Sequence, residues 1–587
     1  MSKTSRPQGA TRRTFLQGVP AALVAGAGIR VEAQPAQAGL VASGDEAISR
    51  ATLQCAEELV GLTFTDPEEE LMLAVVRRNR EFFEALRRVP VPADTEPAVG
   101  FRPPSPAAPA AAPSPSATAP RAPAGSRRRT LPRVEVRDAV ESLAFQPVTV
   151  LAEAVRSRQV TSTALTRMYL NRLKTHGQRL EAVVTLTEEV GLAQAAEADR
   201  EIAAGRYRGP LHGMPWGVKD LFATRGIRTT WGAKPYERQM IETDATTVVR
   251  LRDAGAVLVA KLTTGELARG NVWFGGRTIN PWGSARSSGG SSAGPGAAAA
   301  GGLVAFTIGT ATGGSIVQPA SMCGAVGLQP TYGRVSRHGV MTLRWTLDRV
   351  GPICRSVEDC MLVLGAIAGP DGHDETVADV PMSWDPDAPL DGVRIGYVAR
   401  MFEEPPAGGG AGRTRWPAQR AALQAALDVF RKIGRVGPVA LPDLPADALY
   451  AVIEAEAGAS FDDLVRSGDV AQLAGKGVND RANTLRASRF IPAVEYIRAQ
   501  RVRTLLIRAM NEIFTRCDVI LTPPELGVVR TTSLTGHPCI TLKSGFVDGM
   551  PEAILLTGPL YNEGLMARVA LAYEQATDWK DRHPQMS

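Results

Sequence analysis

The spacing of apolar residues divides the chain into two differently organised parts. Between about Asp45 and Arg88, apolar residues recur every three or four positions, which predicts two amphipathic helices. Gly61 is expected to end the first helix, whose apolar stripe consists of Ile48, Leu53, Ala56, Leu59 and Val60.

The second predicted helix begins with a recognisable start signal. Asp66 is the expected N-cap, Pro67 the first helical residue, and Glu69 the residue that closes a capping box. Its buried face is expected to comprise Leu71, Met72, Val75, Phe82 and Leu86. A two-helix hairpin cannot bury both stripes by itself, so we expect it to dock on the rest of the chain. A partner-binding arm is the alternative.

From about residue 136 onward, helical patterns alternate with short apolar strands. Residues 151–173 predict an amphipathic helix with a turn near 160–162, and residues 182–186 and 257–259 are rich in β-formers. The run 303–308 is apolar, contains branched residues and is bounded by glycines, which is typical of a buried strand. This alternation predicts an α/β fold with a layered mixed or parallel sheet.

Pro, Ala and Ser dominate the segment that joins the two parts. It has almost no large apolar side chains, so burial cannot offset the entropy of ordering it, and we expect a semi-extended linker. The predicted organisation is a signal peptide over 1–38, the helical hairpin over 39–88, the linker over 89–135 and a catalytic-type domain over 136–587.

The N-terminus has the order of features expected of an export signal. Arg12 and Arg13 form a twin-arginine pattern, and the apolar stretch 19–29 that follows is too short to span a bilayer comfortably. The small-residue sequence 36–38 then offers a cleavage site before Gly39. We therefore expect an exported, periplasmic or extracellular protein with no membrane contact after cleavage. A tail with a chance arginine pair is the alternative.

Composition narrows the class of protein. The 587 residues are 44% hydrophobic with a formal charge of +6, and no basic face interleaved with aromatic residues accompanies the run 127–129, so no nucleic-acid partner is expected. Six cysteines without a close CxxC pair predict buried, reduced thiols. Six scattered histidines lack an HExxH motif, so we expect neither a metal nor another cofactor.

Lys219 is the first candidate for chemistry. It ends the segment 213–219, where Trp216 and Val218 precede it in an apolar context. A lysine at a strand end is usually a surface charge. If these neighbours bury it, desolvation lowers its pKa and the neutral amine can act as a general base.

Two Gly/Ser-rich segments supply further candidates. The segment 287–294, considered alone, is typical of a flexible loop. The segment 309–316 follows the predicted strand at 303–308, and its Gly313-Gly314-Ser315 sequence lets successive N–H groups converge on a developing oxyanion. A phosphate cradle is the alternative, but the Gly-Lys-Ser/Thr ending of a P-loop is missing.

Together the three segments resemble the Ser-cisSer-Lys triad of the amidase signature family. The resemblance runs from about residue 139 to the C-terminus and includes 209–215, 280–282, 323–331, 347–352, 518–523 and 572–577. It implies that family's α/β fold, a mixed twisted sheet covered by helices on both faces, to which the N-terminal hairpin is added.

The resemblance also implies a role for each residue. Ser315 would be the nucleophile, Ser291, 24 positions earlier, the relay, and Lys219 the base, with a cis peptide bond before Ser291. The neighbours Ser287, Ser288 and Ser292 would not take part. The oxyanion would be held by the backbone N–H groups of Thr312, Gly313, Gly314 and Ser315.

The activity implied is that of an amidase, a hydrolase acting on carbon–nitrogen bonds other than peptide bonds in linear amides. Its partner would be a small-molecule amide, and a homodimer is left open. Two alternatives remain: a non-catalytic small-amide-binding protein on the same fold, and an amidotransferase A-type glutaminase subunit.

Two positions depart from the family pattern. Ala311 and Val317 stand where the family usually has Asp and Arg. Losing one partner of a buried ion pair strands a charge, whereas losing both is nearly neutral if apolar packing fills the space. The segment 393–516 is expected to set the substrate. Within it, Asp462-Asp463 and Glu495 could bind a cation or be solvated helix charges.

Overall fold

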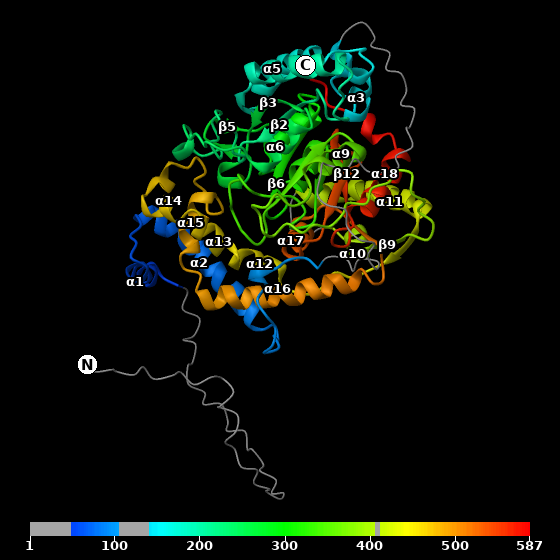
Figure 1. The fold of residues 1–587 in the computed structure, drawn as a ribbon. Helices are drawn as coiled ribbons and strands as arrows, with labels where there is room; N and C mark the ends of the chain where they lie inside the picture. The colour runs from blue at the N-terminus through cyan, green and yellow to red at the C-terminus, as the bar shows by residue number, and fades with distance from the viewer. Residues whose placement is uncertain (1–47, 105–139, 406–410, 587) are drawn as a thin grey trace, which may run out of the picture. The chain divides into compact units, whose positions relative to one another are not determined.

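The computed structural model describes residues 48–104, 140–405 and 411–586 (Figure 1). The predicted signal peptide at 1–38 and the part of the predicted linker beyond residue 104 lie outside these ranges. The proposed boundaries of the signal, hairpin, linker and catalytic-type domain therefore stay predictions.

An eleven-stranded mixed sheet forms the centre of the described chain. Its strands follow the order β1-β3-β2-β6-β8-β7-β12-β13-β11-β9-β10, so several neighbours are distant in sequence. The strands are β1 (Val183–Leu186), β2 (Pro215–Lys219), β3 (Val257–Leu262), β6 (Phe306–Ala311), β7 (Val326–Gln329), β8 (Arg349–Cys354), β9 (Arg394–Tyr397), β10 (Arg435–Pro438), β11 (Val519–Thr522), β12 (Cys539–Val547) and β13 (Met550–Thr557). A separate two-stranded ribbon pairs β4 (Val272–Trp273) with β5 (Gly276–Arg277).

Helices cover both faces of the sheet. They are α1 (Arg50–Val60), α2 (Asp66–Arg87), α3 (Val148–Arg156), α4 (Ser162–Arg172), α5 (Glu188–Ala203), α6 (Thr246–Asp253), α7 (Ala293–Ala300), α8 (Val317–Cys323), α9 (Val357–Ile367), α10 (Ala399–Glu403), α11 (Ala411–Ile433), α12 (Ala446–Val452), α13 (Glu454–Ser460), α14 (Asp462–Arg466), α15 (Arg481–Ser488), α16 (Ala493–Ile513), α17 (Leu526–Thr535) and α18 (Glu563–Gln575). The α/β fold predicted from the sequence, with a mixed sheet between helices, is confirmed.

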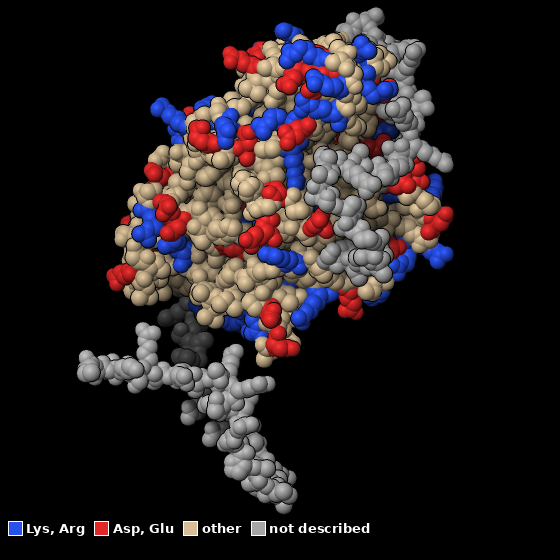
Figure 2. Space-filling view, in the orientation of Figure 1, with Lys and Arg blue, Asp and Glu red and all other residues tan. Residues whose placement is uncertain are grey.

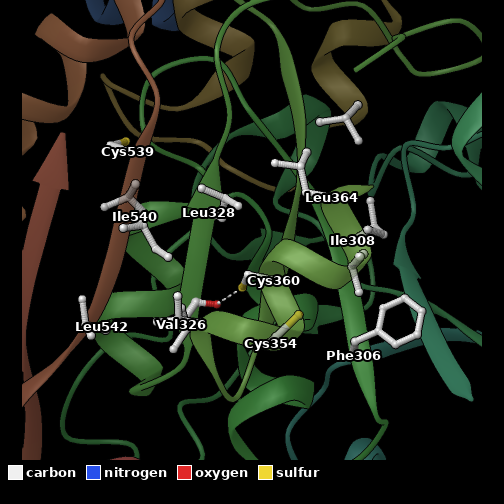
Figure 3. Close-up of a cluster of buried hydrophobic side chains, with 14 of the residues drawn as sticks. Phe306, Ile308, Val326, Leu328, Cys354, Cys360, Leu364, Cys539, Ile540 and Leu542 are labelled. Carbon is white, nitrogen blue, oxygen red and sulfur yellow. Dashed lines mark hydrogen bonds between the residues drawn. The ribbon is translucent and has the colours of Figure 1, made fainter. Parts of the chain in front are cut away.

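Alternation along the strands sends side chains into two apolar cores. Val257 and Val259 of β3 pack with the alanines of α7, whereas Leu258 between them belongs to the other core. Figure 3 shows part of that second core, where Phe306 and Ile308 of β6 lie with side chains from β7, α9 and β12. The period of two in side-chain direction is what separates the layers.

The predicted strand at 303–308 is displaced along the chain. Residues 303–305 are buried in a turn, and β6 begins at Phe306 and continues to Ala311. Gly309 and Thr310, expected in the catalytic turn, therefore belong to the strand. Apolar composition does not separate a buried turn from a buried strand, since both exclude water.

The N-terminal hairpin forms as predicted, with one shift in capping. Gly61 ends α1 with φ of 65°. The residue that precedes α2 is Thr65 rather than Asp66, and Glu68 rather than Glu69 accepts a hydrogen bond from its N–H at 3.0 Å. Leu59, assigned to the buried stripe, is 88% exposed.

The hairpin packs on helices α12, α15 and α16, beside which Figure 1 shows α2. Asn483 Nδ2 donates to the Leu71 carbonyl at 2.9 Å, and Glu68 forms an ion pair with Arg486. After α2, Arg501 of α16 donates to the Thr95 carbonyl at 2.8 Å. Docking of the hairpin on the rest of the chain is therefore confirmed.

The cysteines are unpaired, and all but Cys55 are buried. Figure 3 shows Cys354, Cys360 and Cys539 among apolar side chains, with Cys360 Sγ donating to the Val326 carbonyl at 3.6 Å. The exposed Cys55 departs from the prediction of buried thiols. Across the part of the chain that the structure describes, no helix is both long and apolar enough to cross a membrane.

Candidate active site

Lys219 lies at the carboxyl end of β2, at the centre of one half of the sheet. Strand β2 runs parallel to both β3 and β6, so the ends of these strands reach the same edge. The Lys219 Nζ donates to Ser291 Oγ at 2.8 Å and to Thr310 Oγ1 at 2.9 Å. The side chain is fully buried.

Burial determines the protonation behaviour of this lysine. Desolvation lowers the pKa of Lys219 well below its ordinary value of 10.5, and the carboxylate of Asp348 opposes the shift. In the described structure no carboxylate forms an ion pair with Lys219, in contrast to Lys261, whose Nζ lies 3.0 Å from Asp220 Oδ1. An amine in this setting is suited to accept a proton from a hydroxyl.

Ser291 is held in a tightly packed loop. The Gly290–Ser291 peptide bond is cis, as the family resemblance implies. The Ser291 carbonyl accepts a hydrogen bond from Gly265 N at 3.2 Å. A Cβ built on Gly290 would lie only 2.0 Å from the carbonyl oxygen of Gly270, so this position accommodates glycine alone.

The four neighbouring serines have different partners. Ser288 Oγ donates to the Thr278 carbonyl at 2.8 Å, Ser292 Oγ donates to the Thr310 carbonyl at 3.0 Å, and Ser287 Oγ accepts from Gly289 N at 3.1 Å. Of the four, Ser291 is the one whose hydroxyl contacts Lys219. The geometry thus favours the serine that the family spacing selects.

Ser315 lies in the turn between β6 and α8 and is half-buried. Gly314 in this turn has φ of 114°, a conformation that favours glycine. The Ser315 carbonyl accepts from Ser292 N at 3.2 Å, which joins the turn to the Ser291 loop. In the described part of the chain, the hydroxyls of Ser291 and Ser315 make no hydrogen bond to each other.

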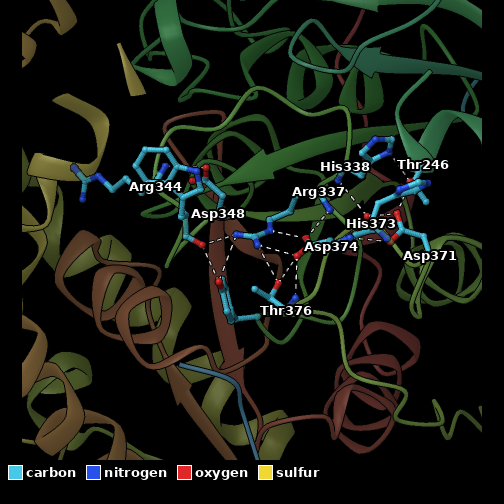
Figure 4. A network of polar contacts seen from close by, with 12 residues as sticks. Thr246, Arg337, His338, Arg344, Asp348, Asp371, His373, Asp374 and Thr376 are labelled. Carbon is cyan, nitrogen blue, oxygen red and sulfur yellow. Dashed lines mark hydrogen bonds and ion pairs between the residues drawn. The ribbon is translucent and has the colours of Figure 1, made fainter. Parts of the chain in front are cut away.

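Asp348 anchors the same turn from the other side. Its Oδ1 accepts from Thr312 Oγ1 at 2.6 Å, and its Oδ2 accepts from the N–H groups of Leu343 and Arg344 at 2.7 and 2.8 Å. Burial raises the pKa of Asp348, while these hydrogen bonds act in the opposite direction. Figure 4 shows Asp348 within a polar network that continues to Arg337 and Asp374.

A cavity of about 200 Å³ reaches the turn from this network. Its wall includes Thr310, which contacts Lys219, together with Thr312, Ala268 and Asp348. No role for Thr310 or Asp348 was predicted from the sequence. The only signal for Asp348 was its place in the 347–352 segment of the resemblance.

Ala311 and Val317 are both buried in apolar surroundings. Ala311 is 1% exposed and packs with Ile316 and Ala320, while Val317 is fully buried in the larger core. Apolar packing therefore takes the place of the Asp and Arg of the family pattern. Because both charges are absent, no unpaired charge is left buried at either position.

The titratable side chains that the structure describes do not gather into a metal site. Over the ranges that the structure describes, no three His, Cys, Asp or Glu side chains could together hold a metal ion. The groups that meet at Lys219 are the hydroxyls of Ser291 and Thr310 and the Thr310 carbonyl, a set suited to proton transfer.

Comparison with known proteins points to the same family as the contact between Lys219 and Ser291 and the cis peptide bond before Ser291. The family model described as Amidase matches residues 164–527. This chain belongs to the amidase signature family. The matched region contains Lys219, Ser291 and Ser315, as well as Asp348.

Relatives in the amidase signature family have more than one activity. The chain is 36% identical over 484 residues to the A-subunit of glutamyl-tRNA(Gln) amidotransferase from Roseiflexus sp. (strain RS-1), covering 74% of this chain and 97% of the relative. It is 35% identical over 485 residues to the protein of the same name from Methylococcus capsulatus, covering 74% and 97%.

Solved amidase signature structures share the fold. The peptide amidase of Stenotrophomonas maltophilia superposes with a TM-score of 0.66 at 30% identity, covering 76% of this chain and all of the other. A protein from a vestigial complex related to the origins of an s-triazine catabolic enzyme gives a TM-score of 0.67 at 28% identity, covering 73% and 98%.

Proposed function

We propose that this protein is a serine amidohydrolase that cleaves a carboxylic amide through an acyl-enzyme on Ser315. The observation that carries the proposal is the 2.8 Å contact between Lys219 Nζ and Ser291 Oγ in a fully buried setting. A lysine whose pKa is lowered by burial is able to drive such a relay without histidine.

The proposed steps follow from the positions of these groups. The hydroxyls of Ser315 and Ser291 rotate towards each other, neutral Lys219 takes the Ser291 proton, and Ser291 takes the Ser315 proton. Ser315 Oγ then bonds to the amide carbon. The N–H groups of Thr312, Gly313, Gly314 and Ser315 hold the oxyanion. The relay returns the proton to the leaving nitrogen, the carbon–nitrogen bond breaks, and water hydrolyses the ester.

A fluorophosphonate probe tests this assignment directly. We expect covalent labelling at Ser315 in the wild type and none in Ser315→Ala. Ser292→Ala is the matched control, because its hydroxyl contacts the Thr310 carbonyl and not Lys219. A folded wild-type protein that remains unlabelled would favour the non-catalytic amide-binding alternative.

We further propose that the protein is exported, as an amidohydrolase acting on its own rather than as part of an amidotransferase. The proposal rests on the twin-arginine pattern and the cleavage site before Gly39. The expected result is a periplasmic or secreted protein whose N-terminal residue is Gly39. An intact N-terminus in the cytosolic fraction would contradict export and favour the amidotransferase alternative.

A further inference from the structure

Tyr450 of α12 lies against the turn that precedes Ser315. A Cβ built on Gly313 would lie 2.3 Å from Tyr450 Oη, so the phenol is in close contact with this turn. The side chains that surround Tyr450 therefore also surround the place where the substrate carbonyl would bind.

Arginines surround Tyr450 on several sides. The guanidinium groups of Arg344 and Arg530 lie over its ring, 4.1 and 5.1 Å from the centroid. Arg530 forms an ion pair with Asp447 at 2.6 Å. The charges of Arg344 and Arg530, together with those of Arg269 and Arg481, lower the pKa of Tyr450 despite its burial.

Arg344 and Arg481 share a single carboxylate. Glu454 pairs with Arg344 through one oxygen and with Arg481 through the other, the latter at 2.7 Å. Both arginines are almost fully buried. Glu454 thus neutralises at most one of the two positive charges.

Arg269 has no such partner. Over the described chain, its guanidinium makes no hydrogen bond and no ion pair. Burial and the like charge of Arg530 lower the pKa of Arg269. Its neighbour Gly270 contacts Gly290, the residue before Ser291. Leu267 and Ala268 have φ of 43° and 62°, a strained backbone that persists only where the surroundings enforce it.

Arg78 of α2 adds a positive charge from the N-terminal hairpin. Its Nη1 donates to Asn479 Oδ1 at 2.8 Å, and its Nε is buried without a partner. Burial lowers its pKa, as do the charges of Arg269 and Arg530. Figure 1 shows α2 beside α12 and α15, the helices that carry Tyr450 and Arg481.

The five arginines therefore outnumber the carboxylates paired with them, Glu454 and Asp447. Asp480 and Glu81 act on Arg269 and Arg78 only at longer range. Half-buried like charges without counter-ions are costly, and an anionic ligand would remove that cost. Guanidinium groups also match the geometry of a carboxylate.

We propose that the substrate amide carries a carboxylate, and that Arg269 binds it with Arg78 and Arg530 nearby. The proposal deepens the function proposed above and rests on it. Two of the three carboxylates that the sequence offered for a cationic substrate are already engaged, because Asp462 pairs with Arg489 and Glu495 pairs with Arg87. The third, Asp463, is exposed.

Matched substrate pairs test the proposed charge preference. Succinamate, glutaramate and adipamate are each compared with the neutral primary amide of the same chain length. At least one anionic member should have a kcat/KM about 10- to 100-fold above its neutral counterpart, as expected for a charge-assisted contact. Equal kcat/KM values within every pair would overturn the proposal.

Variants of the arginines test the site itself. Arg269→Gln should lower kcat/KM for the anionic amide about tenfold more than kcat/KM for the neutral amide, which removes most of the charge preference. Arg269→Lys should retain part of that preference. Arg77→Gln is the matched control on α2, since Arg77 is exposed and donates to the Ile48 carbonyl. A preference unchanged in Arg269→Gln would contradict the assignment.

A binding measurement separates this proposal from the proposed catalysis. Calorimetry on Ser315→Ala, which cannot turn over, should show glutaramate binding about tenfold more tightly than pentanamide, and Arg269→Gln should abolish the difference. If wild-type Ser315 is not labelled by the fluorophosphonate but this difference appears, only the catalytic proposal fails. Labelling without any charge preference would overturn only the carboxylate site.

Discussion

Thr312 Oγ1 donates a hydrogen bond of 2.6 Å to Oδ1 of Asp348. The negative charge of this carboxylate partly opposes the lowering of the Lys219 pKa by burial. One buried side chain thus connects the turn before Ser315 to the proton affinity of Lys219, the proposed base. The two residues are 36 positions apart in the sequence.

Asp348→Asn should therefore alter both rate and pH dependence. Loss of the negative charge removes an interaction that favours protonated Lys219, so the pKa of Lys219 should fall and the acidic limb of the kcat/KM profile should move to lower pH. We also expect kcat to fall about tenfold, because the hydrogen bonds that Asp348 accepts from Thr312 and from the N–H groups of Leu343 and Arg344 would be weakened.

Thr312→Val is the matched control for this prediction. It removes the same hydrogen bond but leaves the carboxylate charge, so the rate should fall without a shift of the acidic limb. Identical profiles for Asp348→Asn and the wild type would show that Asp348 does not act on Lys219.

Lys219→Met should lower kcat by about 10²- to 10⁴-fold, the usual contribution of a general base. In the wild type, kcat/KM should rise with pH as Lys219 loses its proton, with a midpoint well below 10.5. Lys174→Met, which removes an exposed ion pair with Glu188, serves as the control. A wild-type rate in Lys219→Met would exclude Lys219 as the base.

The same lysine should make stability depend on pH. Because its folded pKa lies below its unfolded value, the unfolded chain binds more protons between the two values, and stability rises with pH. The free energy of unfolding should gain about 1.4 kcal/mol per pH unit from this group in that range. Urea denaturation of wild type and Lys219→Met from pH 7 to 9 should show a steeper rise of stability with pH in the wild type, because other buried groups such as Lys261 contribute equally to both proteins.

Restoring the family's charges one at a time should destabilise the protein. Ala311→Asp or Val317→Arg alone would bury an unpaired charge, at a cost of about 3–5 kcal/mol each. If the two side chains pair as in the family pattern, the double variant should lose less stability than the sum of the singles. Strict additivity in urea denaturation would show that the positions are independent in this protein.

Local sequence signals located the main parts of the candidate site. The apolar residues around Lys219 pointed to its burial, and the family spacing selected Ser291 among four serines; the structure places both in contact. Gly313 and Gly314 were expected in a special turn, and the φ of Gly314 agrees. Such signals are readable because glycine conformations and strand ends depend on a few adjacent residues.

Element boundaries were less well determined by the same signals. Thr65 instead of Asp66 precedes α2, and β6 begins at Phe306 instead of Leu303. In both cases neighbouring residues satisfy the local rule equally well, and contacts with the rest of the fold choose between them.

The sequence by itself determined the α/β alternation, the amphipathic hairpin and the residues from which a Ser-Ser-Lys relay could be built, because each depends on local composition and spacing. Only the tertiary structure decided that Asp348 would hold Thr312, that Tyr450 would contact Gly313, and that Arg78 and Arg269 would share one region with Arg530. These partners come from segments up to several hundred residues apart. An excess of arginines over carboxylates in one region therefore becomes visible only when the fold brings these side chains together.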